Sequence, residues 1–98
     1  MTRVRLAQGV IEDLDRIVEH LQRHEIEGAE ARGDEIVSAF DVLAENPFIG
    51  RPAGDDKREL IIGRGTPGYV ALYRYLSLID VALILAIRAQ REGGYARP

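Results

Sequence analysis

The sequence predicts an α+β domain in which a helical hairpin packs on a small, mainly antiparallel sheet, in the order β-α-α-β-β-β. Three observations support this fold class. The chain has 98 residues, enough for one domain with a modest core. Apolar residues recur at helical spacing over much of the first half. The last third instead holds short apolar or alternating runs separated by turn residues, which is typical of strands.

The first half of the chain alternates briefly and then takes a helical period. Residues 3–7 alternate basic and apolar side chains, which predicts a half-buried strand. Over residues 10–21 apolar positions recur every three or four residues, which predicts an amphipathic helix. Its acidic residues, Asp13 among them, are expected on the polar side and near the positive end of the helix dipole.

A second helix is expected over residues 27–45, with Gly33 weakening it by about 1 kcal/mol relative to alanine. Pro47 ends this helix, because the residue before a proline is driven out of the helical region. The link between the two helices is short, so they should form an antiparallel hairpin. A turn-rich connection, residues 46–56, then leads to the sheet.

Three strands are expected in the last third, over residues 60–62, 68–76 and 81–88. Their short connections predict an antiparallel meander. The last of them is an almost continuous apolar run, which predicts burial on both faces of the sheet. The strand at residues 3–7 has no hairpin neighbour in the sequence, so it should pair with one of these three and complete a four-stranded sheet.

Charge is divided unevenly along the chain. Residues 1–50 carry a net charge of −6 and residues 51–98 a net charge of +3, within an overall charge of −3. This asymmetry predicts two faces with different partners. All but one of the thirteen basic residues are arginine, whose planar guanidinium suits carboxylates and phosphates. A genome rich in arginine codons is an equal alternative explanation for the arginine bias.

Composition excludes several classes of protein. There is no cysteine, so neither a disulfide framework nor a thiolate zinc site is possible. Acidic residues interrupt the first apolar stretch, which is unlike a signal peptide. The longest apolar run, residues 81–87, is far too short to cross a bilayer. A cytoplasmic protein with no membrane partner is therefore expected.

Two patterns that suggest ligand sites have simpler explanations. Residues 63–68 match G-x-G-x-x-G, but a strand follows where a dinucleotide site needs a helix, so a hairpin loop is expected. His20 and His24 share one helix face and could hold a metal ion, yet no third ligand stands out. Solvated surface histidines are the favoured interpretation, and no cofactor or metal is expected.

Polar residues, most of them arginines, gather at the expected strand ends. Arg58 begins a strand and Arg88 ends one. A cluster of this kind predicts a site that binds anionic groups of a target. The alternative is that strand ends usually carry charge, with Arg74 paired to Glu59 or Asp80. The candidate target-binding residues are Arg58, Arg64, Arg74, Arg88, Gln90, Arg91 and Tyr95.

Several segments together resemble one family. They are EDLDRIVEHL in the first helix, the turn NPFIGRP, the strand RELII, the strand GYVALYRY and the closing ILAIRAQRE. In this order, and over nearly the whole chain, they resemble the RelE/ParE superfamily of toxins from bacterial type II toxin–antitoxin modules. The resemblance implies the same β-α-α-β-β-β fold that the periodicity predicts.

The superfamily divides by function. RelE-like members cut mRNA on the ribosome with basic residues and a tyrosine, but Val70 stands where the family implies an arginine. Apolar residues 60–62 likewise replace expected basic ones. The resemblance therefore favours the ParE branch, whose members are not enzymes themselves but poison DNA gyrase. The alternative, a metal-independent mRNA endonuclease, would use as catalytic residues Arg58, Arg64, Arg88, Arg91 and Tyr95.

The resemblance also implies partners. A ParD-like antitoxin, of the ribbon-helix-helix type, is expected to neutralise the toxin, and DNA gyrase is the expected target. DNA is expected to be met only through gyrase or the antitoxin complex. The antitoxin should wrap a tail around the helical hairpin and the apolar sheet edge. Its expected binding residues are Ile11, Leu14, Val18, Leu21, Ile36 and Phe40.

Overall fold

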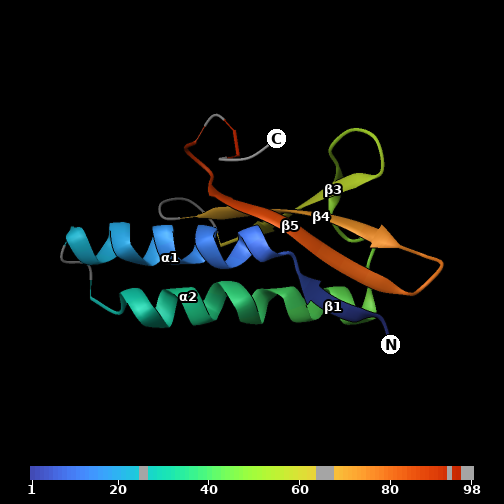
Figure 1. Cartoon of the computed structure of the whole chain (residues 1–98), viewed down its shortest axis with the longest axis horizontal. Helices are drawn as coiled ribbons and strands as arrows, with labels where there is room; N and C mark the ends of the chain where they lie inside the picture. Colours follow the sequence, from blue (N-terminus) through green and yellow to red (C-terminus); the bar gives the residue numbers. More distant parts are fainter. Residues whose placement is uncertain (25–26, 64–67, 93, 96–98) are drawn as a thin grey trace.

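A computed structural model describes residues 1–24, 27–63, 68–92 and 94–95, and it shows a helical layer covering one face of a five-stranded sheet (Figure 1). The elements, in chain order, are β1 (Arg3–Leu6), α1 (Gln8–Arg23), α2 (Ala29–Ser38), the 3₁₀ helix η1 (Ala39–Asp41), α3 (Val42–Glu45), β2 (Arg51–Pro52), β3 (Lys57–Ile62), β4 (Tyr69–Leu76) and β5 (Val81–Ala89).

The sheet has the order β1-β5-β4-β3-β2, and all its pairs are antiparallel except β1 with β5. The predicted α+β class, the mainly antiparallel sheet and the meander of β3, β4 and β5 are confirmed. The predicted count of four strands is wrong, because β2 adds a fifth by pairing Arg51 with Glu59. A strand of two residues, one of them a proline, carries no alternation from which it could have been predicted.

The expected pairing of the first strand with a later one is also confirmed. β1 lies parallel to β5, with Arg3 opposite Val81 and Leu6 opposite Ile84. The Thr2 hydroxyl donates a hydrogen bond of 2.6 Å to an Asp80 carboxylate oxygen. The beginning of the chain is therefore held to the turn between β4 and β5.

The two helical segments run antiparallel, as expected (Figure 1). The second does not continue as one α-helix, because residues 39–41 tighten into η1. In a 3₁₀ turn side chains three apart eclipse each other, which places both Phe40 and Leu43 in the core. Gly33 has a packing role, since a Cβ there would lie 3.0 Å from the Val18 Cγ2 atom of α1.

A β-bulge interrupts β5. Two consecutive residues of β4 pair with Ala86 and Ile84, so Leu85 is the extra residue. An extra residue reverses the alternation of a strand. Ile84 before the bulge and Ile87 after it both join the core beneath the helices. Arg88 consequently lies on the opposite face of the sheet, which we call the open face, in register with Val70.

Asp13 of α1 holds this bulge. Its side chain is buried on the same helical stripe as Val10, Ile17 and Leu21. The Asp13 carboxylate accepts a hydrogen bond of 2.9 Å from the Ile87 N–H. The expectation that Asp13 lies on the polar side of the helix is therefore wrong. Burial of its carboxylate is tolerated because a backbone donor meets it.

The connection with the sequence NPFIGRP is held by two side chains of the sheet. The Tyr73 hydroxyl donates to the Pro47 carbonyl at 2.7 Å and accepts from the Gly50 N–H at 2.9 Å. Arg58 donates to the carbonyls of Phe48 and Gly50 at 3.2 and 2.8 Å. Gly50 has no room for a side chain, because a Cβ would lie 2.6 Å from the Tyr73 ring.

Tyr73→Phe should lower the free energy of unfolding by about 1–3 kcal/mol, because it leaves the buried Gly50 N–H and the Pro47 carbonyl without their partner. Urea unfolding measures the change. Tyr75→Phe is the matched control, since its hydroxyl makes an exposed hydrogen bond to Asp80 and its loss should cost less than about 0.5 kcal/mol. Equal losses in the two variants would contradict this account.

Candidate functional site

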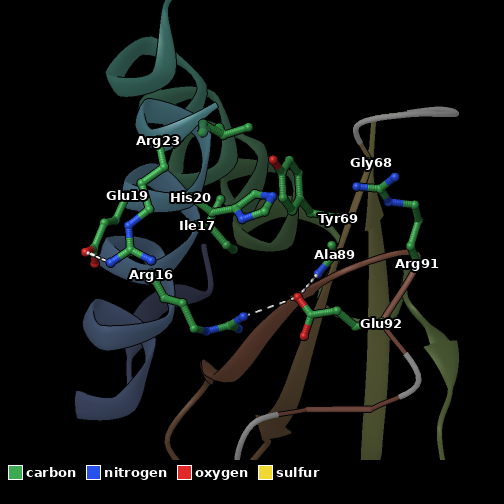
Figure 2. Close-up of a pocket in the computed structure, with 11 residues that line it drawn as sticks. Arg16, Ile17, Glu19, His20, Arg23, Gly68, Tyr69, Ala89, Arg91 and Glu92 are labelled. Atoms are coloured by element: carbon green, nitrogen blue, oxygen red, sulfur yellow. Dashed lines mark hydrogen bonds and ion pairs between the residues drawn. The ribbon is translucent and has the colours of Figure 1, made fainter. Parts of the chain in front are cut away.

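A pocket opens between the second half of α1 and the neighbouring ends of β4 and β5 (Figure 2). Its volume is about 450 Å³. The floor is apolar, with contributions from both helix and sheet, and the rim is charged. The lining residues are Arg16, Ile17, Glu19, His20, Leu21, Arg23, Gly68, Tyr69, Ala89, Arg91 and Glu92.

Most rim charges on the helix side of the pocket are already paired. Arg23 contacts Glu19 at 2.6 Å, one helical turn away, and Arg16 contacts Glu92 at 3.2 Å across the mouth (Figure 2). Arg91 stands on the opposite side. Within the described parts of the chain Arg91 makes no hydrogen bond or ion pair, so its guanidinium is available to an anionic group of a partner.

Glu59 is the centre of a polar cluster on the open face of the sheet. The Tyr95 hydroxyl donates to the Glu59 carboxylate at 2.5 Å, and Arg51 and Arg88 contact it at 3.0 and 3.7 Å. The Arg88 guanidinium also lies 5.1 Å from the centre of the Tyr95 ring. The side chains of Arg88 and Glu59 are only 15% and 14% exposed, so these contacts are shielded from water.

Arg88 also closes the turn that follows β5. Its guanidinium donates to the carbonyls of Ala89, Gln90 and Glu92, at 3.2, 3.4 and 2.9 Å. A guanidinium with this many partners on its own chain has little capacity left for a phosphate. Arg88 therefore shapes the end of the chain.

The electrostatics of the cluster follow from these contacts. The hydrogen bond from Tyr95, helped by Arg51 and Arg88, lowers the pKa of Glu59 against the opposing effect of burial. Burial, followed by the hydrogen bond to Glu59, raises the pKa of the Tyr95 hydroxyl far above its usual range. At neutral pH Glu59 is ionised and Tyr95 keeps its proton.

The remaining target-binding candidates are scattered. Gln90 donates to the Gly63 carbonyl at 3.3 Å. Arg74 pairs with neither expected acid, since Glu59 contacts Arg51 and Arg88, and Asp80 accepts from Thr2 and Tyr75. Arg64 and the rest of the expected glycine loop, residues 64–67, lie outside the described residues.

Three of the six expected antitoxin-binding residues lie in the core. Leu21, Ile36 and Phe40 are almost fully buried against the sheet. The prediction missed this because helical spacing identifies an apolar face but does not say whether the sheet or a partner covers it. Leu14 and Val18 are partly buried and pack on that core. Ile11 alone of the six is exposed, with 52% of its surface accessible.

The two histidines are exposed, as expected, with His20 on α1 and His24 at the C-terminal cap of that helix. Their ring centres are 4.3 Å apart, and a His24 ring nitrogen lies 2.9 Å from the His20 carbonyl oxygen. Within the described ranges no group of three or more metal-ligating side chains assembles. Separately, none of the helices described here is long and apolar enough to span a membrane.

Sequence reasoning missed the two residues that organise these sites, Asp13 and Glu59. One available signal was the position of Asp13, which keeps the three-to-four residue spacing of the apolar stripe. Glu59 carries a weaker signal, as the one acidic residue among residues 57–62 of a strand rich in basic and apolar ones. Neither signal reveals the partner across the sheet.

Comparison with known proteins places this fold among toxins of toxin–antitoxin systems. A family model described as the ParE toxin of the type II toxin–antitoxin system parDE matches residues 4–93. The chain therefore belongs to the ParE toxin family, and the resemblance found in the sequence is confirmed. A search of curated proteins found no match.

Two solved structures are similar to this chain. One belongs to the chromosomal ParDE system of P. aeruginosa, with 25% identity and a TM-score of 0.73 over 91% of this chain and 96% of the other. The second belongs to the intact E. coli RelBE toxin–antitoxin complex, with 10% identity and a TM-score of 0.67 over 94% of this chain and 100% of the other. The latter likeness concerns the fold alone.

Glu59→Gln should flatten the acid side of the stability curve. A carboxyl whose pKa is lowered by folding stabilises the protein above its unfolded pKa, and this contribution is lost as pH falls through the folded value. Wild type should therefore lose more stability than Glu59→Gln between about pH 5 and pH 3 in urea titrations. Glu30→Gln, at an exposed site of α2, should follow wild type. Parallel curves for wild type and Glu59→Gln would refute the cluster.

Proposed function

We propose that this protein is the toxin of a type II toxin–antitoxin module, that it poisons DNA gyrase, and that a cognate ParD-like antitoxin neutralises it. Membership of the ParE family supports the first part. Gyrase is the target that the family implies. A toxin acting on gyrase would work in the cytoplasm, which is the location we propose. In this proposal the toxin binds gyrase and traps its complex with cleaved DNA, and the toxin itself cuts no phosphodiester bond.

The observation that carries this proposal is the engagement of the nuclease candidates within their own domain. Arg58 holds the connection before β2, and Arg88 and Tyr95 are bound to Glu59. Metal-independent RNA cleavage needs a general base and a general acid with pKa values near the working pH. A tyrosine with a strongly raised pKa that already donates to a carboxylate is a poor base.

Val70 supports the same conclusion. It is 1% exposed on β4, in register with Arg88, where the nuclease branch would carry an arginine. A valine there supplies no charge for a phosphate or a leaving oxygen. Of the five nuclease candidates, Arg91 is the one in the described residues whose guanidinium has no hydrogen-bond or ion-pair partner.

Exposed apolar side chains of the helical layer offer a docking area for the antitoxin. Ile11 is exposed, and Val37 and Val42 are 40% exposed on the second helical segment. A tail that is disordered alone would fold as it covered such apolar surface. Because it would bind only the folded toxin, it would also raise the melting temperature of the toxin by linkage.

A supercoiling assay with purified toxin and gyrase tests the proposal. We expect supercoiling to be inhibited and gyrase-linked cleaved DNA to accumulate. Arg91→Ala should raise the toxin concentration required about tenfold, as loss of a central arginine contact does at interfaces. Arg32→Ala is the matched control, since that arginine contacts Glu35 on α2, outside the pocket, and should leave inhibition unchanged.

The opposite result has a clear form. Gyrase that supercoils normally in excess toxin, without trapped DNA, would reject the proposal. Toxin-dependent cuts in translated mRNA that vanish in Arg91→Ala would establish the endonuclease alternative instead.

A further inference from the structure

The two layers of the molecule carry opposite charge. The helical segments of residues 8–23 and 29–45 contain nine acidic residues and three arginines. The open face of the sheet is the reverse. Strand register places one acid there, Glu59, against six basic residues: Arg3, Arg5, Arg51, Lys57, Arg74 and Arg88. The uneven charge of the sequence therefore becomes two faces in space.

Part of this basic face is neutralised and part is not. Arg51 and Arg88 contact Glu59. In the described parts of the chain, Lys57 and Arg74 form no ion pair with an acidic residue. They are direct cross-strand partners on β3 and β4, and the next residue along the same row is Leu83 of β5, followed by Arg5 of β1. The row thus joins three cations across four strands.

Like charges directly opposite each other on a sheet destabilise it. Within the described ranges neither Lys57 nor Arg74 forms a salt bridge. The Arg74 Nε atom is moreover buried and has no hydrogen-bond partner, whereas buried polar atoms of folded proteins are nearly always satisfied. An anion from another molecule would therefore stabilise this pair of cations.

The surface at this pair is hollowed. Lys57 and Arg74 line a pocket of about 570 Å³ at the end of the β3–β4 ladder, together with Arg58 and the Ser77 of the β4–β5 turn. Two acidic residues of the β2–β3 turn, at positions 55 and 56, also line it. Neither carboxylate lies within ion-pairing distance of the cations, so the pocket keeps an uncompensated positive side.

We propose that Lys57 and Arg74, with Arg5 further along the row, bind the phosphodiester backbone of a nucleic acid. The spacing suits a chain of anions, because neighbouring strands are about 4.8 Å apart and Arg5 lies about 10 Å from Arg74 across Leu83. Among the residues that the structure describes, no base-reading element accompanies the row, so we expect the contact to be independent of sequence.

This inference goes beyond the proposed function and does not require gyrase as the target. It replaces the expectation that DNA is met only through other proteins with a direct contact of the toxin. If gyrase is the target, the basic row would contact phosphates of the DNA that is bound to gyrase.

Fluorescence anisotropy with the full chain and labelled duplexes of about 20 base pairs, one DNA and one RNA, tests the proposal without gyrase. Wild type should bind both duplexes or one of them. A plot of the logarithm of the association constant against the logarithm of salt concentration should have a slope of about −3, for three phosphate contacts. The double variant K57Q/R74Q should bind about tenfold more weakly at low salt, with a slope closer to −1.

Controls keep the result interpretable. Arg32→Gln removes an arginine of the acidic helical layer that contacts Glu35 and lines neither pocket, and it should bind as wild type does. Removing like charges should leave the melting temperature of K57Q/R74Q no lower than that of wild type. If that double variant fails to fold, Lys57→Gln alone, at a partly exposed site, should still make the salt dependence shallower, reducing the magnitude of the slope by about 1.

Each outcome decides the matter. Loss of binding in the row variants supports the proposal, and the duplex that binds more tightly identifies the source of the phosphates. Binding that is unchanged in K57Q/R74Q, or reduced to the same extent in Arg32→Gln, overturns it. A polyglutamate peptide that displaces the duplexes at equal charge concentration would also overturn it, in favour of a protein partner.

Discussion

The bulge at Leu85, held by the hydrogen bond from the Ile87 N–H to Asp13, determines which face of the sheet the last side chains of β5 occupy. Strict alternation from Ile84 would turn Arg88 toward the helices and Ile87 away from them. With one extra residue, Ile87 fills the core and Arg88 reaches Glu59 on the open face. The cluster of Glu59 and its partners exists because of this local irregularity.

The cost of this arrangement is a buried carboxylate in the middle of an apolar stripe. Asp13 is 2% exposed and has Arg16 at 3.9 Å as well as the backbone donor. An apolar side chain would pack there without desolvation, but it would leave a buried amide unpaired, which costs about 1–3 kcal/mol. The position therefore favours a side chain that accepts a hydrogen bond over one that only fills space.

The periodicity of apolar residues was sufficient to predict most of the fold, but it could not predict the contacts of the candidate functional site. Helical spacing over residues 10–21 and short connections in the last third predict the layers and the meander. The bulge was hidden because residues 81–87 are apolar throughout, so a change of phase leaves no trace in the pattern. Periodicity also could not distinguish an apolar face that packs in the core from one that binds a partner. Leu21 and Phe40 were therefore predicted to bind the antitoxin, although both lie in the core.

Arginine composition likewise could not separate structural from available cations. Arg58 and Arg88 donate to backbone carbonyls of their own domain, whereas Arg74 keeps a buried nitrogen without a partner. These residues are the same type at similar strand positions, and only the neighbours differ. The division of charge along the chain was the more reliable guide, because it follows the division into an acidic helical layer and a basic sheet face.

The measurement that tests the central role of Asp13 most directly is native-state hydrogen exchange at the Ile87 amide, followed by NMR. In wild type this amide should exchange as slowly as the central amides of β4, through global unfolding only. In Asp13→Ala it should exchange at least about tenfold faster relative to those amides. Asp15→Ala, an exposed neighbour on α1, should leave it protected. Equal protection of Ile87 in both variants would contradict the account.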